Sequence, residues 1–367
     1  MAGHVVLPDD SQWVQIESNI EEFLAALRSS EKLSDTFDGL IRLVWSNERI
    51  FGKPSRSRRC RALLAAVARV FDGELDYFRR TIKAVLSTLL QLREGDEIPF
   101  LSACRVEGEM KEMTLNRLQV LGLVASMMFS CLPEQPSGEL RPDCDFAYIR
   151  ELDVEKACCI LRFIGGGVLE GGNVQEEIRF SICPELIVSM LGCEVMIDNE
   201  AIRIEGATRF SRHKGYGSAF EWLGMYDTRQ AVSQDGIRDV SIFCVDALEH
   251  PGLKQFSSEL VLREIRKFHA GVCTHAHESA RARGIATGNW GCGVFGGDPQ
   301  LKFIIQWIAS SLAGRPVLRY YPYGEKKLER LAEFVEFVKE YKVSRLAEIA
   351  QKLQSSSAVF QQVMIAL

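Results

Sequence analysis

Two glycine clusters and a polar triplet follow one another in the middle of the chain. Gly165, Gly166 and Gly167 are separated by three residues from Gly171-Gly172, and Gln175-Glu176-Glu177 follows two residues later. Glycine lets backbone lie close to a ligand and adopts positive φ without strain, and successive free N–H groups bind anions. Adjacent carboxylates after such a loop indicate acid–base chemistry on a phosphorylated substrate.

A second glycine-rich run, Ala-Thr-Gly-Asn-Trp-Gly-Cys-Gly-Val-Phe-Gly-Gly-Asp, occupies residues 286–298 and precedes an apolar segment that predicts a helix over 300–312. Its amides and the helix N-terminus could both face an anion. Taken alone, a turn that packs helix on sheet explains the run equally well. Trp290 is large for a flexible loop and could line a pocket, as could Phe295. The candidate binding residues here are Asn289, Gly291, Cys292, Gly293, Val294, Phe295 and Gly296.

Tyrosines and histidines give weaker signals. Tyr216 lies between two glycines, which by itself predicts an exposed turn, and Tyr323 follows a predicted strand, where aromatic residues usually belong to a core. His275 and His277, after Cys273, match no common zinc spacing. We therefore predict no metal.

The two glycine-rich motifs together resemble the poly(ADP-ribose) glycohydrolase family. The first, GGGVLEGGNVQEEIRF, resembles the glycine triplet and Gln-Glu-Glu signature of that family, and ATGNWGCG-x-FGGD resembles its second hallmark. The resemblance implies a macrodomain-like, three-layer α/β/α fold. It also implies a glycosidase that hydrolyses ribose–ribose O-glycosidic bonds of poly(ADP-ribose) and releases ADP-ribose, without a metal or an organic cofactor.

The same resemblance assigns roles to the candidate residues. Glu177 would be the acid and later the base, which requires it to be protonated near neutral pH through burial and the charge of Glu176. Glu176 would orient the riboses, and Gln175 would hold the loop. Both glycine runs would hold the diphosphate, while Tyr216 would stack on the adenine and Tyr323 would pack on the scissile ribose. Adjacent residues project in different directions, so the two glutamates are not an ordinary face-to-face pair.

The sequence departs from the family just before the glycine triplet. The family has a strand with Asp-Phe-Ala-Asn, then a basic and an aromatic residue. Here residues 158–164 read Cys-Cys-Ile-Leu-Arg-Phe-Ile, so only Arg162 and Phe163 fit. The chain reads as if intervening strands had been removed, as in a shortened isoform. Two hypotheses therefore stand: an active glycohydrolase, or a weak or inactive ADP-ribose-binding relative. Asp198, Asp235 and Asp246 are the candidates that could replace the missing aspartate.

Composition limits the setting in which the protein works. The 367 residues carry a net charge of -5, which gives no general attraction to nucleic acid. The 11 scattered cysteines indicate reduced thiols, and we find no signal peptide or membrane span. We expect a protein of the nucleus, the cytoplasm or both, with no membrane partner and no sequence-specific nucleic acid binding. The family resemblance implies a role in the DNA damage response, and poly(ADP-ribose) on modified proteins as partner.

Apolar periodicity predicts a helical accessory region over residues 1–140 and an α/β catalytic domain over residues 141–367. Helices are predicted at 20–27, 40–44, 61–71, 75–92 and 115–132, the last capped by Thr114 and buried all round. Strands are predicted at 194–197, 202–204, 240–245 and 317–321. Further helices are predicted at 184–191, 259–268, 300–312, 326–341 and 343–353.

Overall fold

The computed structural model describes residues 5–52, 75–93, 98, 111–133, 164–168, 172–227, 238, 240–273, 283–353 and 357–367. The chain forms two compact units. Unit 1 comprises Met1–Ala103, Glu109–Val195 and Gly206–Val240; unit 2 comprises Cys104–Gly108, Met196–Glu205 and Ser241–Leu367. The boundary predicted near residue 140 and the helix predicted at 61–71 fall outside the described residues.

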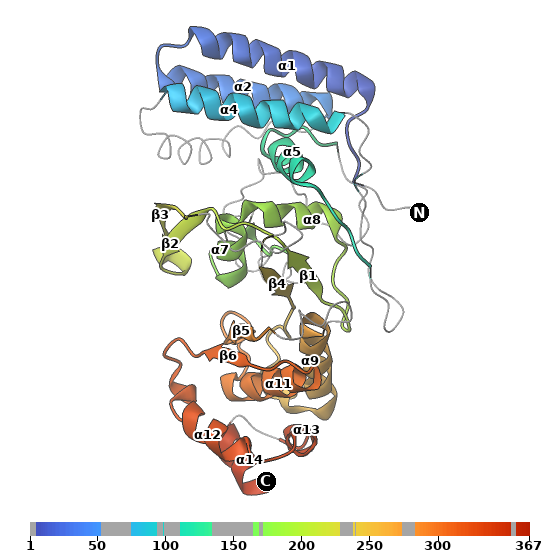
Figure 1. Ribbon diagram of the computed structural model, residues 1–367, viewed down its shortest axis with the longest axis vertical. Helices are drawn as coiled ribbons and strands as arrows, with labels where there is room; N and C mark the ends of the chain where they lie inside the picture. Colours follow the sequence, from blue (N-terminus) through green and yellow to red (C-terminus); the bar gives the residue numbers. More distant parts are fainter. Residues whose placement is uncertain are drawn as a thin grey trace. The chain divides into compact units, whose positions relative to one another are not determined.

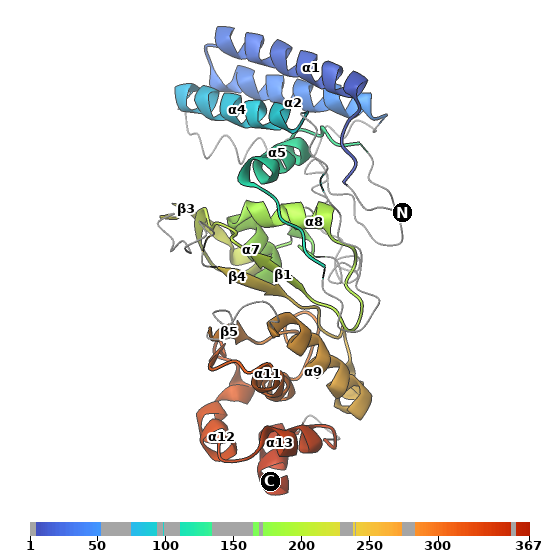
Figure 2. The same ribbon diagram turned by 45° about the vertical axis from the view of Figure 1, so that its right-hand side comes forward.

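Three long helices of unit 1 lie side by side (Figures 1 and 2): α1 (Asp10–Ser29), α2 (Leu33–Ile50) and α4 (Leu75–Leu90), which a short 3₁₀ turn, η1 (Gln91–Arg93), extends. Apolar residues three or four positions apart give each helix one buried face. On α1 these residues include Ile16, Ile20 and Phe23. The helices predicted at 20–27, 40–44 and 75–92 are confirmed.

Helix α5 (Arg117–Met128) differs from its prediction at its start. Asn116 caps it, not Thr114, because Asn116 and Gln119 exchange hydrogen bonds of 3.0 and 2.8 Å in a capping box. The helix is also not buried all round, since Leu118 is 57% exposed. Only its later part packs inward. There the buried Asn47 of α2 donates to the carbonyl of Phe129 at 3.0 Å.

The remainder of unit 1 carries the first glycine motif. Helix α7 (Gln175–Ile182) leads into the 3₁₀ turn η5 (Pro184–Ile187) and helix α8 (Val188–Gly192), which confirms the helix predicted at 184–191. A hairpin follows, made of β2 (Ser211–Lys214) and β3 (Glu221–Met225), with the 3₁₀ turn η6 (Gly217–Ala219) between them. Periodicity did not predict this hairpin.

Unit 2 contains two strand pairs. Strands β1 (Ile202–Glu205) and β4 (Ser241–Cys244) are antiparallel, whereas β5 (Ile285–Gly288) and β6 (Leu318–Tyr321) are parallel. The strand predicted at 194–197 is wrong. Its last residue, Ile197, bonds instead to side chains: its N–H donates to Glu200 at 3.1 Å, and its carbonyl accepts from Lys267.

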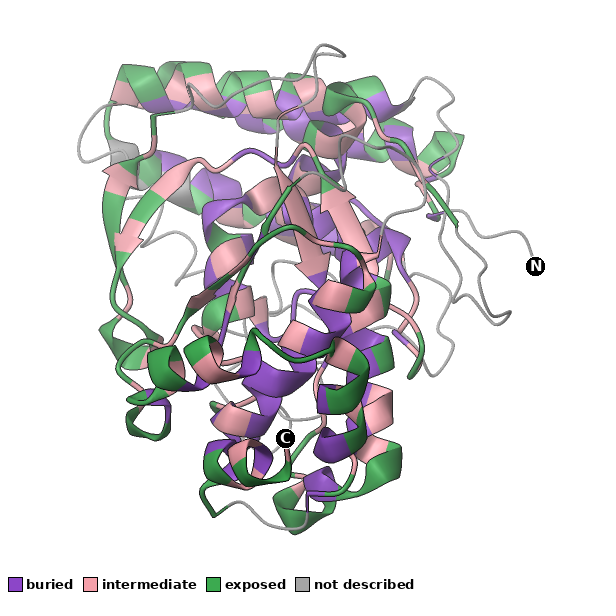
Figure 3. Ribbon diagram, turned by 60° about the horizontal axis from the view of Figure 1, so that its bottom comes forward, coloured by how far each residue is buried: buried purple, intermediate pink, exposed green. Residues whose placement is uncertain are grey.

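Helices build most of the core of unit 2. Helix α11 (Pro299–Leu312) packs on α9 (Ser258–Val272), and Figure 3 shows buried residues along one side of the helices and exposed residues along the other. The helices predicted at 259–268, 300–312, 326–341 and 343–353 are confirmed in outline, while α14 was not predicted. The remaining elements are η7 (Gly252–Phe256), η8 (Lys326–Leu328), α12 (Leu331–Val338), α13 (Val343–Ala350) and α14 (Val359–Ala366).

Helices and strands are thus mixed, as the α/β prediction requires. Within the described residues the strands form three two-stranded sheets. In the parallel pair, both strands end at the same edge, where β5 gives way to the second glycine-rich loop and β6 to Tyr323. The carboxyl ends of parallel strands are a common place for ligands in α/β folds.

Candidate active site

The glycine triplet forms a tight, buried turn in unit 1. Gly165 has φ +92° and Gly166 φ +51°, a region that favours glycine. A Cβ on Gly165 would lie 2.7 Å from the sulfur of Met190 and 3.1 Å from the ring of Phe180. Glycine is therefore required at residue 165 by both conformation and space.

Both glutamates of the triplet hold this turn. Glu176 Oε1 accepts the N–H of Gly165 at 2.7 Å, and Glu177 Oε1 accepts the N–H of Gly167 at 3.1 Å. Glu177 Oε2 also accepts the N–H of Val174 at 3.1 Å. These bonds join the glycine loop to the first turn of α7. They also occupy the amides of Gly165 and Gly167, which the family resemblance assigned to the diphosphate.

Glu177 is 5% exposed, and both its oxygens accept backbone N–H groups. Its bond to Val174 is the N3-to-N-cap half of a capping box, and a carboxylate at this end of a helix is favoured by the helix dipole. A purely structural role as a helix cap is therefore one reading of Glu177. The contact with Gly167, ten residues away, goes beyond that role. Gln175, at the start of α7, is exposed.

Tyr216 lies beside the same helix start. The N–H of Gly217 donates to the carbonyl of Asn173 at 2.8 Å, which fixes the turn against the residues before α7. Burial raises the pKa of the Tyr216 hydroxyl; a hydrogen bond with the Gln175 backbone opposes this shift, and the charge of Glu177 adds to it. The tyrosine is nonetheless 57% exposed, so part of it is open to a flat ligand.

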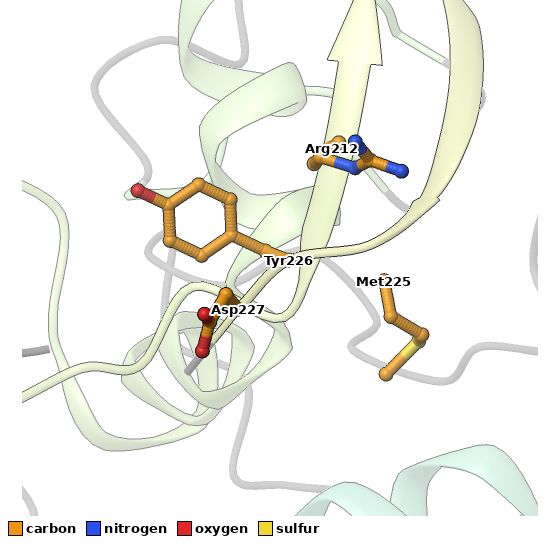
Figure 4. Close-up of a pocket in the computed structure, with 4 residues that line it drawn as sticks. All are labelled: Arg212, Met225, Tyr226 and Asp227. Atoms are coloured by element: carbon orange, nitrogen blue, oxygen red, sulfur yellow. The ribbon is translucent and has the colours of Figure 1, made fainter. Parts of the chain in front are cut away.

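An open hollow of about 530 Å³ lies at the base of the β2–β3 hairpin. Figure 4 shows the four side chains that line it, from Arg212, Met225, Tyr226 and Asp227. The guanidinium of Arg209 lies 4.4 Å from the centre of the Tyr226 ring. The predicted site residues of unit 1 do not line this hollow.

In unit 2, Asn289 connects the second glycine-rich loop to the end of β6. Its Oδ1 accepts the hydroxyl of Tyr320 at 3.0 Å, and its Nδ2 donates to the carbonyl of Pro322 at 3.0 Å. Both polar atoms of the side chain are thus used within the protein. Asn289 therefore sets the spacing between the loop and Tyr323.

The rest of this loop is built around a closed turn. The N–H of Gly297 donates to the carbonyl of Gly291 at 2.9 Å, and that of Gly296 to Gly293 at 3.1 Å. Phe295 is buried and Val294 is 56% exposed. Burial raises the pKa of the Cys292 thiol to about 12, and the charge of Asp298 adds to this shift. Cys292 is therefore a packed thiol and not a nucleophile at neutral pH.

Trp290 points into unit 2 instead of lining an open pocket. Its Nε1 donates to the carbonyl of Val245 at 2.8 Å, and its ring centre lies 5.3 Å from that of Phe268. Tyr323, in contrast, is 82% exposed and has φ +51°. A Cβ on Gly288 would lie 3.2 Å from its ring, so Tyr323 stands at the end of β5.

The predicted site residues therefore form two groups. Gly165, Gly166, Gly167, the Gln-Glu-Glu triplet and Tyr216 gather in unit 1. Residues 289–296 and Tyr323 gather in unit 2.

Of the aspartates considered as replacements, Asp246 is buried and ion-paired to Arg263 at 2.7 Å. Asp198 is also paired to Arg263, at 3.1 Å, whereas Asp235 is outside the described residues. In the part of the chain that the structure describes, no three His, Cys, Asp or Glu side chains are grouped to hold a metal ion. His275, His277 and the departing segment 158–163 are likewise not described.

Sequence reasoning missed one group of charged residues next to the second loop. Arg263, Glu264, Lys267 and Lys302 form buried ion pairs with one another or with Asp246. Their spacing on α9 and α11 resembles any charged helix face, so only the packing identifies them.

Comparisons with known proteins define the class. Residues 151–330 match the model described as "Poly (ADP-ribose) glycohydrolase (PARG), Macro domain fold". The matched region is therefore an α/β domain of the macro domain fold, and it belongs to the poly(ADP-ribose) glycohydrolase family.

Similarity to individual proteins supports the same family. The chain is 35% identical over 212 residues to "Probable poly(ADP-ribose) glycohydrolase 2" of Arabidopsis thaliana, covering 48% of this chain and 41% of that protein. It is 33% identical over 279 residues to "Poly(ADP-ribose) glycohydrolase 1" of the same plant, covering 58% and 48%. It is 40% identical over 177 residues to "Poly(ADP-ribose) glycohydrolase 1" of Caenorhabditis elegans, covering 45% and 22%. The chain thus spans less than half the length of these relatives.

Proposed function

We propose that this chain hydrolyses the ribose–ribose O-glycosidic bonds of poly(ADP-ribose) and releases ADP-ribose. One observation carries the proposal: two adjacent glutamates are both bonded to the buried glycine turn, with Tyr216 beside them. This places a carboxyl group, a rigid loop and a stacking ring within one unit. The names of the matched relatives supply the substrate class.

Each side chain has a defined task in the proposed reaction. Glu177 delivers a proton to the leaving ribose oxygen and then takes a proton from the attacking water, as a single residue serves as acid and then base. Glu176, fixed by Gly165, orients the riboses. Tyr216 offers its exposed part to the adenine, which holds the scissile bond in place while the proton moves.

In unit 2, the second loop would hold a diphosphate and Tyr323 would pack on a ribose. Two features support these roles: the loop leaves the carboxyl end of a parallel strand pair, and Tyr323 is the most exposed large side chain at that edge. Asn289 acts by keeping the loop and the Tyr323 segment together.

The alternative function is a weak or inactive ADP-ribose-binding module. Two observations favour it: the Asp-Phe-Ala-Asn strand is not found before Gly165, and both oxygens of Glu177 accept backbone N–H groups. A carboxylate used in this way as a helix cap would bind the loop together without transferring a proton.

The setting of the activity is part of the proposal. We infer that the chain acts on polymer attached to modified proteins, in the nucleus or cytoplasm, as part of the DNA damage response. The composition is in keeping with this, through its net charge of -5 and its scattered cysteines. None of the helices in the described part of the chain is long and apolar enough to cross a membrane.

One experiment separates the two functions. The purified chain is incubated with poly(ADP-ribose), and free ADP-ribose is measured by chromatography while polymer binding is measured by filter retention. Release by the parent chain that Glu177→Gln abolishes supports the enzyme. Binding without release supports the binding module, and the absence of both contradicts the two proposals. Glu259→Gln, at an exposed glutamate of α9, is the control.

A further inference from the structure

A buried ionic cluster lies directly against the second glycine-rich loop of unit 2. The ammonium group of Lys302, on α11, pairs with the carboxylate of Glu264, on α9, and both side chains are 2% exposed. The same ammonium lies 4.0 Å from the centre of the Trp290 ring, over its face. A cation over an indole face is attracted by the ring electrons, more strongly when water is excluded.

Lys302 also fills the space beneath the loop backbone. A Cβ on Gly291 would lie 3.2 Å from Lys302 Nζ, and a Cβ on Gly297 would lie 3.1 Å from Lys302 Cε. These two glycines close the turn through their own hydrogen bond of 2.9 Å. The lysine side chain therefore packs against the backbone of the turn formed by residues 291–297 and supports its shape.

A second layer of charges holds Lys302 in this position. Glu264 accepts from Arg263 at 2.5 Å, and Arg263 reaches Asp246 at 2.7 Å. Asp246 in turn pairs with the buried ammonium of Lys267. Arg263 also pairs with Asp198 at 3.1 Å, so the three cations face three carboxylates, of which Asp198 is 64% exposed and Asp246 and Glu264 are buried.

Burying an ionised lysine is costly even when it is paired. Burial lowers the pKa of Lys302 well below its usual value, and the charge of Arg263 adds to this shift, while Asp246 opposes it. An anion bound at the loop would favour the ionised form of Lys302, because an opposite charge stabilises it.

We propose that Lys302 is a positioning residue for an anion: it holds Trp290 and the turn of Gly291 to Gly297 in the shape that accepts a diphosphate, and its charge attracts that group through the loop. The inference rests on the proposed function, since the diphosphate is that of an ADP-ribose unit. It gives Lys302 and Glu264 a role in ligand binding although neither side chain needs to touch the ligand.

The test uses the full chain with Lys302→Met, which keeps the length of the side chain and removes its charge. Lys339→Met is the matched control, at an exposed lysine that pairs with Glu336 at 2.6 Å. Hydrogen exchange of residues 289–297 is measured by mass spectrometry without ligand. Calorimetry then compares the affinities for ADP-ribose and for adenosine, which lacks the diphosphate.

We expect Lys302→Met to exchange faster in residues 289–297 than the parent and to bind ADP-ribose about tenfold more weakly or worse, as for a lost bond to a charged group. Adenosine affinity should change less than about twofold, since only the diphosphate senses the charge. Equal loss for both ligands would indicate a merely structural role and would overturn the inference.

Two further outcomes keep the inference separate from the proposed function. If the parent chain releases no ADP-ribose from polymer but still binds it, and Lys302→Met weakens that binding alone, the inference holds and the enzyme proposal fails. Unchanged exchange and unchanged ADP-ribose affinity in Lys302→Met overturn the inference whatever the activity. Lys302→Gln, which retains a polar end, replaces Lys302→Met if the latter does not fold.

Discussion

The carboxylate of Glu177 and the backbone N–H of Gly167 are joined by a hydrogen bond of 3.1 Å. This contact makes the candidate acid and the glycine turn a single rigid object. Anything that moves the turn must therefore move the carboxylate, so a change at a nearby glycine should alter the position of the reacting group.

Gly172 tests this coupling. A Cβ at this position would lie 2.8 Å from Glu177 Cγ and 2.9 Å from the carbonyl oxygen of Gly167, so Gly172→Ala must displace one of them. Because small misplacements of a reacting group are expensive, we expect ADP-ribose release to fall by about a hundredfold. Gly314→Ala is the control: Gly314 is exposed, follows α11 outside both glycine motifs, has φ +67° and would place its Cβ within 4 Å of nothing. Equal rates for both variants would contradict the coupling.

Tyr216 should contribute affinity through its ring. Stacking of a base on an aromatic side chain is worth about 1–3 kcal/mol, so Tyr216→Ala should weaken ADP-ribose binding by about 5- to 150-fold. Tyr216→Phe keeps the ring and should bind within about threefold of the parent. Calorimetry on the two variants measures this difference. If Tyr216→Phe loses as much affinity as Tyr216→Ala, the hydroxyl and not the ring makes the contact.

Asp246 should matter for stability because it is buried between two cations. Removing one partner of a buried ion pair costs about 3–5 kcal/mol, so Asp246→Asn should lower the free energy of unfolding by about that amount. Asp198→Asn changes a second aspartate bonded to the same Arg263, but at a side chain that is 64% exposed, and should cost about 1 kcal/mol or less. Urea unfolding followed by circular dichroism measures the free energy of unfolding of both variants. Similar losses in the two variants would show that the buried ion pairs of Asp246 do not stabilise the fold.

The raised pKa of the Cys292 thiol predicts that stability and thiol labelling depend on pH. Its thiol has a pKa of about 12 in the folded chain, against about 8.5 for a free cysteine. The thiolate is therefore scarce at neutral pH, and the folded state loses stability as the pH rises above the pKa of the free thiol. At pH 8, iodoacetamide should label Cys292 at least about a hundredfold more slowly in the folded chain than in urea. Comparable rates in both states, followed by peptide mass spectrometry, would show that the thiol is accessible and ionised.

The sequence pattern predicted the long elements well and the short polar ones poorly. In helices α1 and α11, apolar residues recur every three or four positions over many residues, a pattern that fits a helix and not a strand. The β2–β3 hairpin has no such pattern, because Ser211, His213 and Lys214 are polar and the strands are held by backbone pairing and by the Lys214–Glu221 ion pair. At residues 194–197 the apolar run favoured a strand, but a buried lysine took the carbonyl of Ile197.

For the candidate site, the sequence likewise predicted some features and not others. Its residues could be selected from two long motifs, because glycines and carboxylates at fixed spacing are rare. Their contacts could not: nothing in the sequence indicates that Asn289 bonds to Tyr320 or that Trp290 points inward to Val245. The cluster of Lys302 and Glu264 was missed because charges on separate helices meet only through packing.

The rate of ADP-ribose release by Glu177→Gln, relative to the parent chain, tests the central claim most directly. A lost general acid lowers a rate by about 10²- to 10⁴-fold, and we predict a loss in that range, with ADP-ribose affinity within about threefold of the parent. The control Glu259→Gln should release ADP-ribose at the parent rate. A Glu177→Gln chain that is folded and cleaves polymer within about threefold of the parent rate would contradict the account, and Glu177 would then be a helix cap and no more.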